Sequence, residues 1–345
     1  MSVVDRLIGQ EELTKEEYKE LIMQWKDPVA AEKLRQEAVR LQKLYYGNKV
    51  FIRGLIEFTN CCKNNCYYCG IRRDNRNLKR YRLTKEEILF CCHQGYELGF
   101  RTFVLQGGED VYFDDEKVVE LVSSIKKEYP DCAVTLSIGE KNFESYQAYR
   151  EAGADRYLLR HGTANEAHYG MLHPTDMSLP HRKECLKNLK TLGYQTGAGF
   201  MVGAPGQTVD TLAEDLMYLK ELQPEMVGIG PFLPHCDTDF RDQPAGDVEL
   251  TLYLLSVVRI LLPKVLLPAT TALGTAEKDG KLRGILCGAN VVMPNLSPVA
   301  NRKQYALYNN KACMDEEAAE GIRKLEASLK TIGYEVGFER GDAAK

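Results

Sequence analysis

Three features that mark other classes of protein are missing from this chain of 345 residues. The first twenty residues contain acids and no apolar core of signal-peptide length, so we expect a cytoplasmic protein. The longest apolar run, residues 250–273, is interrupted by two cations and two prolines, Arg259, Pro263, Lys264 and Pro268, so we expect no insertion into a membrane. The formal net charge is −4 and the cations are scattered, so nucleic acid is not an expected partner.

The chain also has no internal repeat and no low-complexity linker. An apolar fraction of 44% is enough to close a large core, and one α/β barrel of about 250 residues with helical additions accounts for the length. Eleven cysteines without a secretory signal do not indicate disulfides, because a reducing cytosol keeps thiols free. Metal binding is therefore the leading explanation for any cluster of cysteines.

Short apolar runs alternate with amphipathic segments from residue 51 onwards, which is typical of a parallel sheet wrapped by helices. Eight strands are predicted, at residues 51–58, 102–106, 133–138, 156–159, 196–202, 226–229, 265–269 and 290–293. Six helices are predicted between them, at residues 85–98, 116–128, 143–152, 181–192, 209–222 and 248–261, and Thr84 with Glu87 predicts a capping box for the first. The predicted fold is an α/β (β/α)8 barrel of the TIM type. Because the segments after strands seven and eight are less clearly helical, a partial barrel of six strands is the alternative.

Helical segments flank the predicted barrel on both sides. We predict an N-terminal helical extension over residues 1–48, the barrel over 49–313, and a C-terminal helix and tail over 314–345. The last helix is expected at residues 316–330, with a frayed tail after residue 338.

Three cysteines follow the first predicted strand, at the barrel end where active sites of this fold lie. Cys62, Cys66 and Cys69 have C-x3-C-x2-C spacing, so three thiolates can hold three irons of a [4Fe–4S] cluster and leave the fourth iron open. An open iron can bind the amino and carboxylate groups of S-adenosylmethionine (SAM) and pass an electron to its sulfonium. The spacing therefore predicts a radical SAM enzyme.

Two other interpretations of the cysteines remain. A structural zinc site ordinarily has four ligands in two pairs, and no second C-x2-C occurs, while Cys61 is awkwardly placed as a fourth ligand. Buried free thiols are the second alternative. That interpretation suits cysteines within or beside apolar elements, namely Cys91, Cys92, Cys132, Cys185 and Cys287, better than it suits the polar loop.

Further candidates follow the carboxyl ends of the predicted strands, where cofactor and substrate would lie. Tyr68 could lie against an adenine or simply pack. The residues that could contact a cofactor are Gly107, Gly108, Glu109, Thr135, Ser137, Arg160, His161 and Arg182. Each has an ordinary alternative: a bare turn for the glycines, a solvated arginine for Arg182, and a structural group for the histidine. Thr270, Thr271 and Met293 end strands seven and eight.

Longer runs of residues resemble a more specific group of proteins than the cysteine spacing alone does. The runs Cys66–Asn75, Ala154–His161, Gly228–Phe232, Pro268–Ala272 and Gly288–Asn295 resemble the branch of the radical SAM superfamily that contains biotin synthase, methylornithine synthase and the FeFe-hydrogenase maturase family HydE. The chain looks most similar to the last of these, over residues 10–313. The resemblance implies a complete barrel with an internal cavity, SAM and one cluster at its mouth, and a cysteine-bound iron carbonyl cyanide substrate.

The resemblance also implies roles for individual residues. Thr135, Arg160 and Arg182 would help to hold SAM, and Arg53, Thr270, Thr271 and Tyr305 would line an anion-binding cavity. Gly162 stands where the family typically has a glutamate, so a SAM-binding carboxylate is missing there. Only Cys313 is present where some members carry three C-terminal cysteines, so a second cluster is not expected.

Three functions are therefore weighed. The first is a HydE-like maturase that cleaves SAM, with an electron donor such as flavodoxin or ferredoxin and other maturases as partners. The second is a methylornithine synthase-like or other enzyme of the same branch. The third is a non-catalytic metallocofactor scaffold, which Gly162 suggests.

Overall fold

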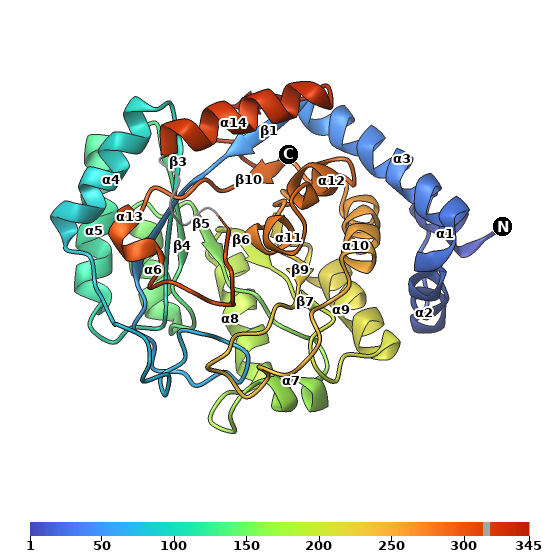
Figure 1. Cartoon of the computed structure of the whole chain (residues 1–345), viewed down its shortest axis with the longest axis horizontal. Coiled ribbons are helices and arrows are strands. Elements are labelled where there is room, and N and C mark those ends of the chain that lie inside the picture. Colours follow the sequence, from blue (N-terminus) through green and yellow to red (C-terminus); the bar gives the residue numbers. More distant parts are fainter. Residues whose placement is uncertain (313–317, 345) are drawn as a thin grey trace.

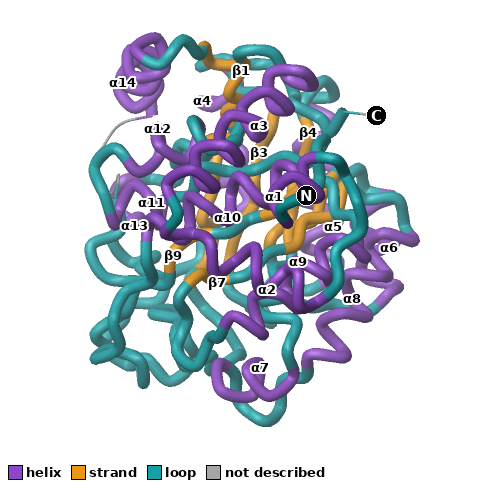
Figure 2. The backbone as a smooth tube through the Cα atoms, turned by 90° about the vertical axis from the view of Figure 1, so that its right-hand side faces the viewer, coloured by secondary structure: helices purple, strands orange, loops and turns teal. Residues whose placement is uncertain are grey.

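The computed structural model describes residues 1–312 and 318–344 and shows a ring of parallel strands surrounded by helices (Figures 1 and 2). The strands are β1 (Lys49–Ile52), β2 (Gly54–Thr59), β3 (Thr102–Gly107), β4 (Ala133–Ser137), β5 (Arg156–Leu158), β6 (Gln195–Ala198), β7 (Met201–Val202), β8 (Met226–Val227), β9 (Gly230–Pro231), β10 (Val291–Val292) and β11 (Glu335–Gly337).

The α-helices lie outside this ring (Figure 2). They are α1 (Val3–Ile8), α2 (Lys15–Met23), α3 (Pro28–Tyr46), α4 (Lys85–Glu97), α5 (Asp115–Glu128), α6 (Phe143–Glu151), α7 (Glu166–Leu172), α8 (Leu179–Thr191), α9 (Val209–Leu222), α10 (Val248–Leu261), α11 (Thr271–Ala276), α12 (Gly280–Ile285), α13 (Val299–Arg302) and α14 (Ala318–Thr331). A short 3-10 helix, η1 (Gln24–Lys26), precedes α3. No helix within residues 1–312 and 318–344 is both long and apolar enough to span a bilayer.

The ring of strands is closed, as predicted. β2, β3, β4, β5, β6 and β8 pair in that order, and β10 pairs with β1, which leads into β2. Residues 265–269 complete the ring, because Leu266 bridges to Met226 of β8 and Pro268 bridges to Val291 of β10. All strand pairs are parallel, so the carboxyl ends of the strands meet at one mouth.

The six predicted barrel helices form within two residues of their expected ends. The capping box of Thr84 and Glu87 is present at α4, which confirms that local prediction. Helix α7 was not predicted. Asn165 caps it by accepting from the backbone N–H of His168.

Four predicted strands are interrupted or only partly formed, contrary to expectation. Strand one divides at Arg53, where the paired neighbours change from β10 and β11 to β3. Strands five and six each break after a few residues, because Gly199, at φ +147°, lies so close to Gly228 that a Cβ would fall 2.0 Å from the Gly228 carbonyl oxygen. Strand seven forms only isolated bridges, and Pro268 has no N–H for a ladder.

The prediction of a frayed tail is wrong. β11 adds to β1, and the residues after it cover the amino-terminal end of the barrel. There the carbonyl oxygen of Arg340 accepts from Thr102 Oγ1 at 2.8 Å and from Arg156 Nη2 at 2.8 Å. The buried guanidinium of Arg156 also pairs with Asp342 at 2.6 Å. Because a buried cation needs polar partners, these contacts hold the tail in one position. The start of the last predicted helix, at residues 316–317, lies outside the described residues, and the division at residues 48 and 313 stays a prediction.

Candidate active site

The cysteine loop follows β2 at the mouth of the barrel, at the lower side of Figure 1. Its backbone is irregular, and side chains add to the backbone hydrogen bonds that hold it. Arg80, which was not predicted as a site residue, donates to the carbonyl oxygens of Asn60, Ile71 and Arg72. The side chain of Asn60 donates to Lys79 O at 2.9 Å. A single guanidinium therefore ties both ends of the loop together.

A cavity of about 280 Å³ lies beside this loop and brings most of the predicted site residues together. Its lining includes the three cysteines and Tyr68 from the loop. It also includes Gly107, Gly108, Glu109, Ser137 and Arg160 from the ends of other strands, Arg182 from α8, and Tyr305 from the segment after α13. Residues from distant parts of the sequence thus converge because all parallel strands end at the same mouth.

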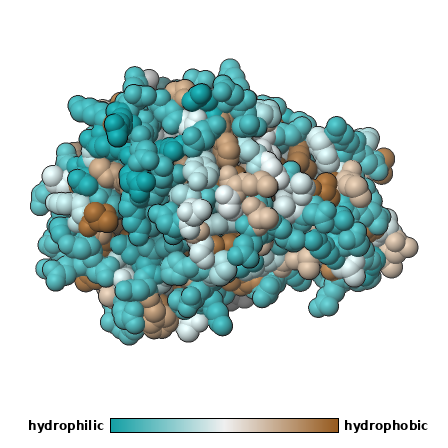
Figure 3. All heavy atoms as spheres, turned by 90° about the horizontal axis from the view of Figure 1, so that it is seen from below, coloured by the Kyte–Doolittle hydropathy of each residue, from teal (hydrophilic) through white to brown (hydrophobic). Residues whose placement is uncertain are grey.

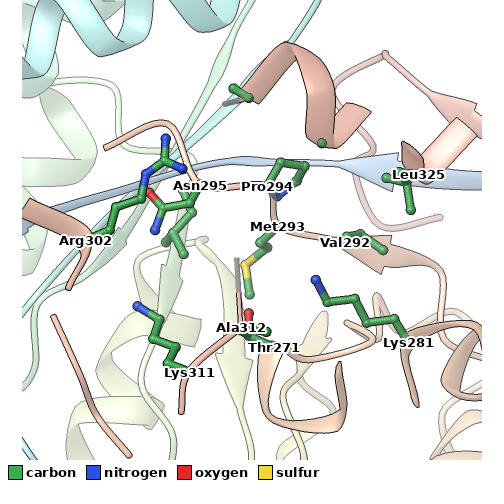
Figure 4. Close-up of a pocket in the computed structure, with 13 residues that line it drawn as sticks. Thr271, Lys281, Val292, Met293, Pro294, Asn295, Arg302, Lys311, Ala312 and Leu325 are labelled. Atoms are coloured by element: carbon green, nitrogen blue, oxygen red, sulfur yellow. The ribbon is translucent and has the colours of Figure 1, made fainter. Parts of the chain in front are cut away.

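Five predicted site residues do not line this cavity. Thr135 is buried on β4, two residues before Ser137, and its hydroxyl has no hydrogen-bond partner in the described residues. Arg53 is buried deeper in the barrel, and its Nε and Nη2 have no hydrogen-bond partner there. Thr270 caps α11. Thr271 and Met293 line a separate cavity of about 80 Å³ (Figure 4).

The three thiols suit a cluster better than a single ion. Burial, with a smaller contribution from the neighbouring thiols, raises the pKa of Cys66 and raises that of Cys69 to about 12. Three thiolates would therefore need a strong positive charge between them. Their sulfur atoms do not all lie within 4.8 Å of one another, whereas thiolates on one zinc ion would be about 3.8 Å apart. Cys61 Sγ lies 3.8 Å from Tyr81 O and so points at the backbone.

Tyr68 is held by a histidine that the sequence did not single out. His173 Nδ1 lies 3.1 Å from the carbonyl oxygen of Tyr169, so Nδ1 carries the proton. His173 Nε2 must then accept from the Tyr68 hydroxyl, at 3.3 Å. Burial and the charge of Arg182 lower the pKa of His173 to about 4, which keeps the ring neutral. The ring of Tyr169 stacks on His173 with centroids 4.0 Å apart.

Arg182 is paired rather than solvated. Its Nε lies 2.6 Å from Glu140 Oε1, and its side chain is 10% exposed. Glu140 was not predicted as a site residue, although it lies only three residues after Ser137. Glu109 packs against Gly139, where a Cβ would lie 1.9 Å from Glu109 Cγ. The cavity wall thus presents the guanidiniums of Arg160 and Arg182 and the carboxylate of Glu109, a charge pattern that can receive an amino acid.

The glycines of the site differ in what they allow. Gly108 is packed against the cysteine loop, since a Cβ there would lie 2.2 Å from Cys61 O. Gly162 has space, because its nearest neighbour to a Cβ would be His173 Cε1 at 3.5 Å, but its φ of +82° disfavours a side chain. His161 faces away from the cavity, buried against Asp215 at 3.2 Å, so the structural interpretation of that histidine holds.

The face that carries the mouth is predominantly hydrophilic with small apolar groups (Figure 3). A closed parallel barrel whose first strand leads into a C-x3-C-x2-C loop beside a charged cavity defines a class: enzymes that cleave SAM at an iron–sulfur cluster. Residues 56–219 match the radical SAM superfamily.

Comparison with known proteins identifies a family within this class. The chain is 47% identical over 310 residues to the [FeFe] hydrogenase maturase subunit HydE of Thermotoga maritima, covering 90% of this chain and 88% of that protein. It is 29% identical to the 3-methylornithine synthase of Methanosarcina acetivorans, covering 88% of this chain and 85% of that protein. The crystal structure of methylornithine synthase superposes with a TM-score of 0.83 at 27% identity, covering 97% of each chain. The chain belongs to the radical SAM superfamily and, within it, to the HydE family.

Proposed function

We propose that this enzyme is a HydE-type maturase of [FeFe] hydrogenase, with one [4Fe–4S] cluster on Cys62, Cys66 and Cys69. The observation that carries the proposal is 47% identity to a maturase subunit across 90% of the chain. The position of the three cysteines around one cavity supports a cluster, in which each thiolate binds a different iron. The fit of the cavity supports SAM as the second cofactor.

The charged and aromatic residues of the cavity have chemical tasks in this proposal. The bound cluster and SAM would supply one-electron cleavage to a 5′-deoxyadenosyl radical. Arg182, held by Glu140, would bind the carboxylate of SAM, and Glu109 would bind its amino group. Tyr68 would present its ring to the adenine in the orientation that His173 sets. The remaining predicted contacts that line the cavity, Gly107, Gly108, Ser137 and Arg160, would enclose the nucleoside.

The proposed substrate is a cysteine-bound iron carbonyl cyanide species, an organometallic anion. Arg53 supports this choice, because a buried guanidinium with two unpartnered nitrogens favours an anionic neighbour. Thr270, Thr271, Met293 and Tyr305 complete the proposed substrate set. We further propose a flavodoxin or ferredoxin as electron donor, contact with other hydrogenase maturases, and a cytoplasmic location.

Anaerobic reconstitution tests the proposal. Reduced protein with iron, sulfide and SAM should show one [4Fe–4S] electron paramagnetic resonance signal that changes on SAM addition, and should form 5′-deoxyadenosine. Cys66→Ala should lose both, and Cys287→Ala, a buried cysteine away from the cavity, should keep both. A parent protein that forms no 5′-deoxyadenosine would support a scaffold instead.

The likeness to methylornithine synthase makes that activity the second candidate. Incubation of the reconstituted enzyme with lysine separates the two. A maturase should leave lysine unchanged and should restore activity to an apo-hydrogenase matured without it. Formation of methylornithine would overturn the maturase proposal while leaving SAM cleavage intact.

A further inference from the structure

A buried ion pair joins the barrel wall to the segment that crosses its mouth. The ammonium of Lys311 pairs with the carboxylate of Glu57 on β2, and the two side chains are 6% and 1% exposed. Lys311 belongs to residues 303–312, called the strap here, which follow α13. Neither residue was predicted from the sequence as part of the site.

Both charges have further polar partners. Asn295 Nδ2 donates to Glu57 Oε2 at 2.8 Å, and Lys311 Nζ donates to the carbonyl oxygen of Tyr305 at 3.0 Å. The same ammonium lies 4.9 Å from the centroid of the Tyr305 ring. Because desolvation offsets most of the attraction in a buried ion pair, such a pair adds geometry more than stability.

The strap lies over the cofactor cavity, and the ion pair joins it to the barrel wall. Tyr305 and Leu307 of the strap line that cavity, and the Tyr305 hydroxyl lies 3.3 Å from Gln106 Nε2. Gly70, directly after Cys69, donates to Leu307 O at 3.0 Å, and a Cβ on Gly70 would lie 2.1 Å from Ala306 O. The strap therefore packs directly on the cysteine loop.

Lys311 also stands between the two cavities. Its side chain lines the smaller cavity together with Thr271, Met293 and Asn295 (Figure 4), while its carbonyl partner, Tyr305, lines the larger one. A shift of Lys311 would move the strap on both sides.

We propose that Lys311 is a positioning residue whose ion pair with Glu57 sets how deeply the strap lies over the SAM site. The proposal rests on the proposed function in that the larger cavity is taken to hold SAM. Tyr305 and Leu307 are the groups through which Lys311 acts. Removing the charge should loosen the strap and weaken SAM binding, with little effect on the step that follows binding.

The test compares Lys311→Met with the double variant Glu57→Gln/Lys311→Met. Lys49→Met/Glu339→Gln removes an exposed ion pair between distant segments and serves as the matched control. Hydrogen exchange of residues 303–312 is measured on protein without cluster or SAM. The KM for SAM and kcat for 5′-deoxyadenosine formation are measured on reconstituted enzyme, and the melting temperature on both.

Lys311→Met should speed exchange across the strap about tenfold and raise the KM for SAM on the order of tenfold, with kcat within about twofold. Its melting temperature should fall, because Glu57 is left as a buried unpaired charge. The double variant should regain the melting temperature and keep the exchange and KM defects. Lys311→Arg should retain most of the parent's KM, and the control should match the parent.

Two results would overturn the inference. The first is an unchanged rate of hydrogen exchange across the strap in Lys311→Met. The second is a double variant whose exchange rate and KM for SAM return to those of the parent, since the ion pair would then be structural only. Failure of the proposed function is distinguishable. In that case the parent itself forms no 5′-deoxyadenosine, and the exchange data still decide whether Lys311 holds the strap.

Discussion

The hydroxyl of Tyr68 has a single acceptor in the described structure, and the proton on His173 Nδ1 determines which atom that is. The pair joins the cysteine loop to helix α7, two segments that are separated by more than a hundred residues. Tyr68 is therefore oriented before a cofactor binds. Preorganisation of this kind lowers the ordering cost of binding.

His173→Leu should weaken SAM binding about fivefold, because one buried hydrogen bond contributes about 1 kcal/mol. Tyr68→Phe should also weaken SAM binding about fivefold. The double variant should bind SAM no more weakly than either single variant, since both substitutions remove the same hydrogen bond. Titration of the reconstituted protein with SAM measures this. His93→Leu, at a similar histidine–tyrosine pair on the outer helices, is the control. Additive losses would contradict a shared role.

His173 also predicts a pH dependence. Its pKa falls from the usual 6.5 to about 4 on folding, so the unfolded chain binds more protons between these values. The stability should therefore be lowest below pH 4, rise by about 3 kcal/mol as the pH increases to 6.5, and level off above it. Urea unfolding of the parent and of His173→Asn at pH 5 and pH 7 measures the difference. An equal slope in the two proteins would refute the assignment.

At the scale of elements, the tail after β11 acts as the closure of the barrel's amino-terminal end. The tail supplies two partners to the fully buried Arg156, the carbonyl oxygen of Arg340 and the carboxylate of Asp342. The tail also reaches Gln195, whose Oε1 accepts from Ala343 N at 3.0 Å. Three strands of the barrel are thereby linked through the last residues of the described chain.

Asp342→Ala should destabilise the protein by about 1–2 kcal/mol. The value is below that for a fully buried pair because Asp342 is 43% exposed and Arg156 keeps its other partners. Denaturant unfolding measures the loss, and Asp242→Ala, at an 88% exposed carboxylate, is the control. A loss equal to that of the control would mean that the tail only rests on the barrel.

At the scale of the whole molecule, the cofactor cavity draws on residues from Cys62 to Leu307. Binding there should stabilise the entire barrel, because SAM bound only to the folded state shifts the unfolding equilibrium. At a hundred times its dissociation constant, SAM should add about 2.7 kcal/mol to the cluster-loaded enzyme. Thermal unfolding under anaerobic conditions measures it. The Cys66→Ala variant should show no such gain, and an equal gain there would mean that SAM binds without the cluster.

Local patterns in the sequence determined the cysteine loop, the alternation of strands and helices, and the capped start of α4, because spacing and capping act over a few residues. The tertiary structure alone decided the partners of Tyr68, Arg182 and Glu57. His173, Glu140 and Lys311 lie on other elements, and no local signal marks them. The order of the tail was likewise decided by a buried arginine far away in the chain. Contacts between elements arise from how the barrel closes, which depends on every strand at once.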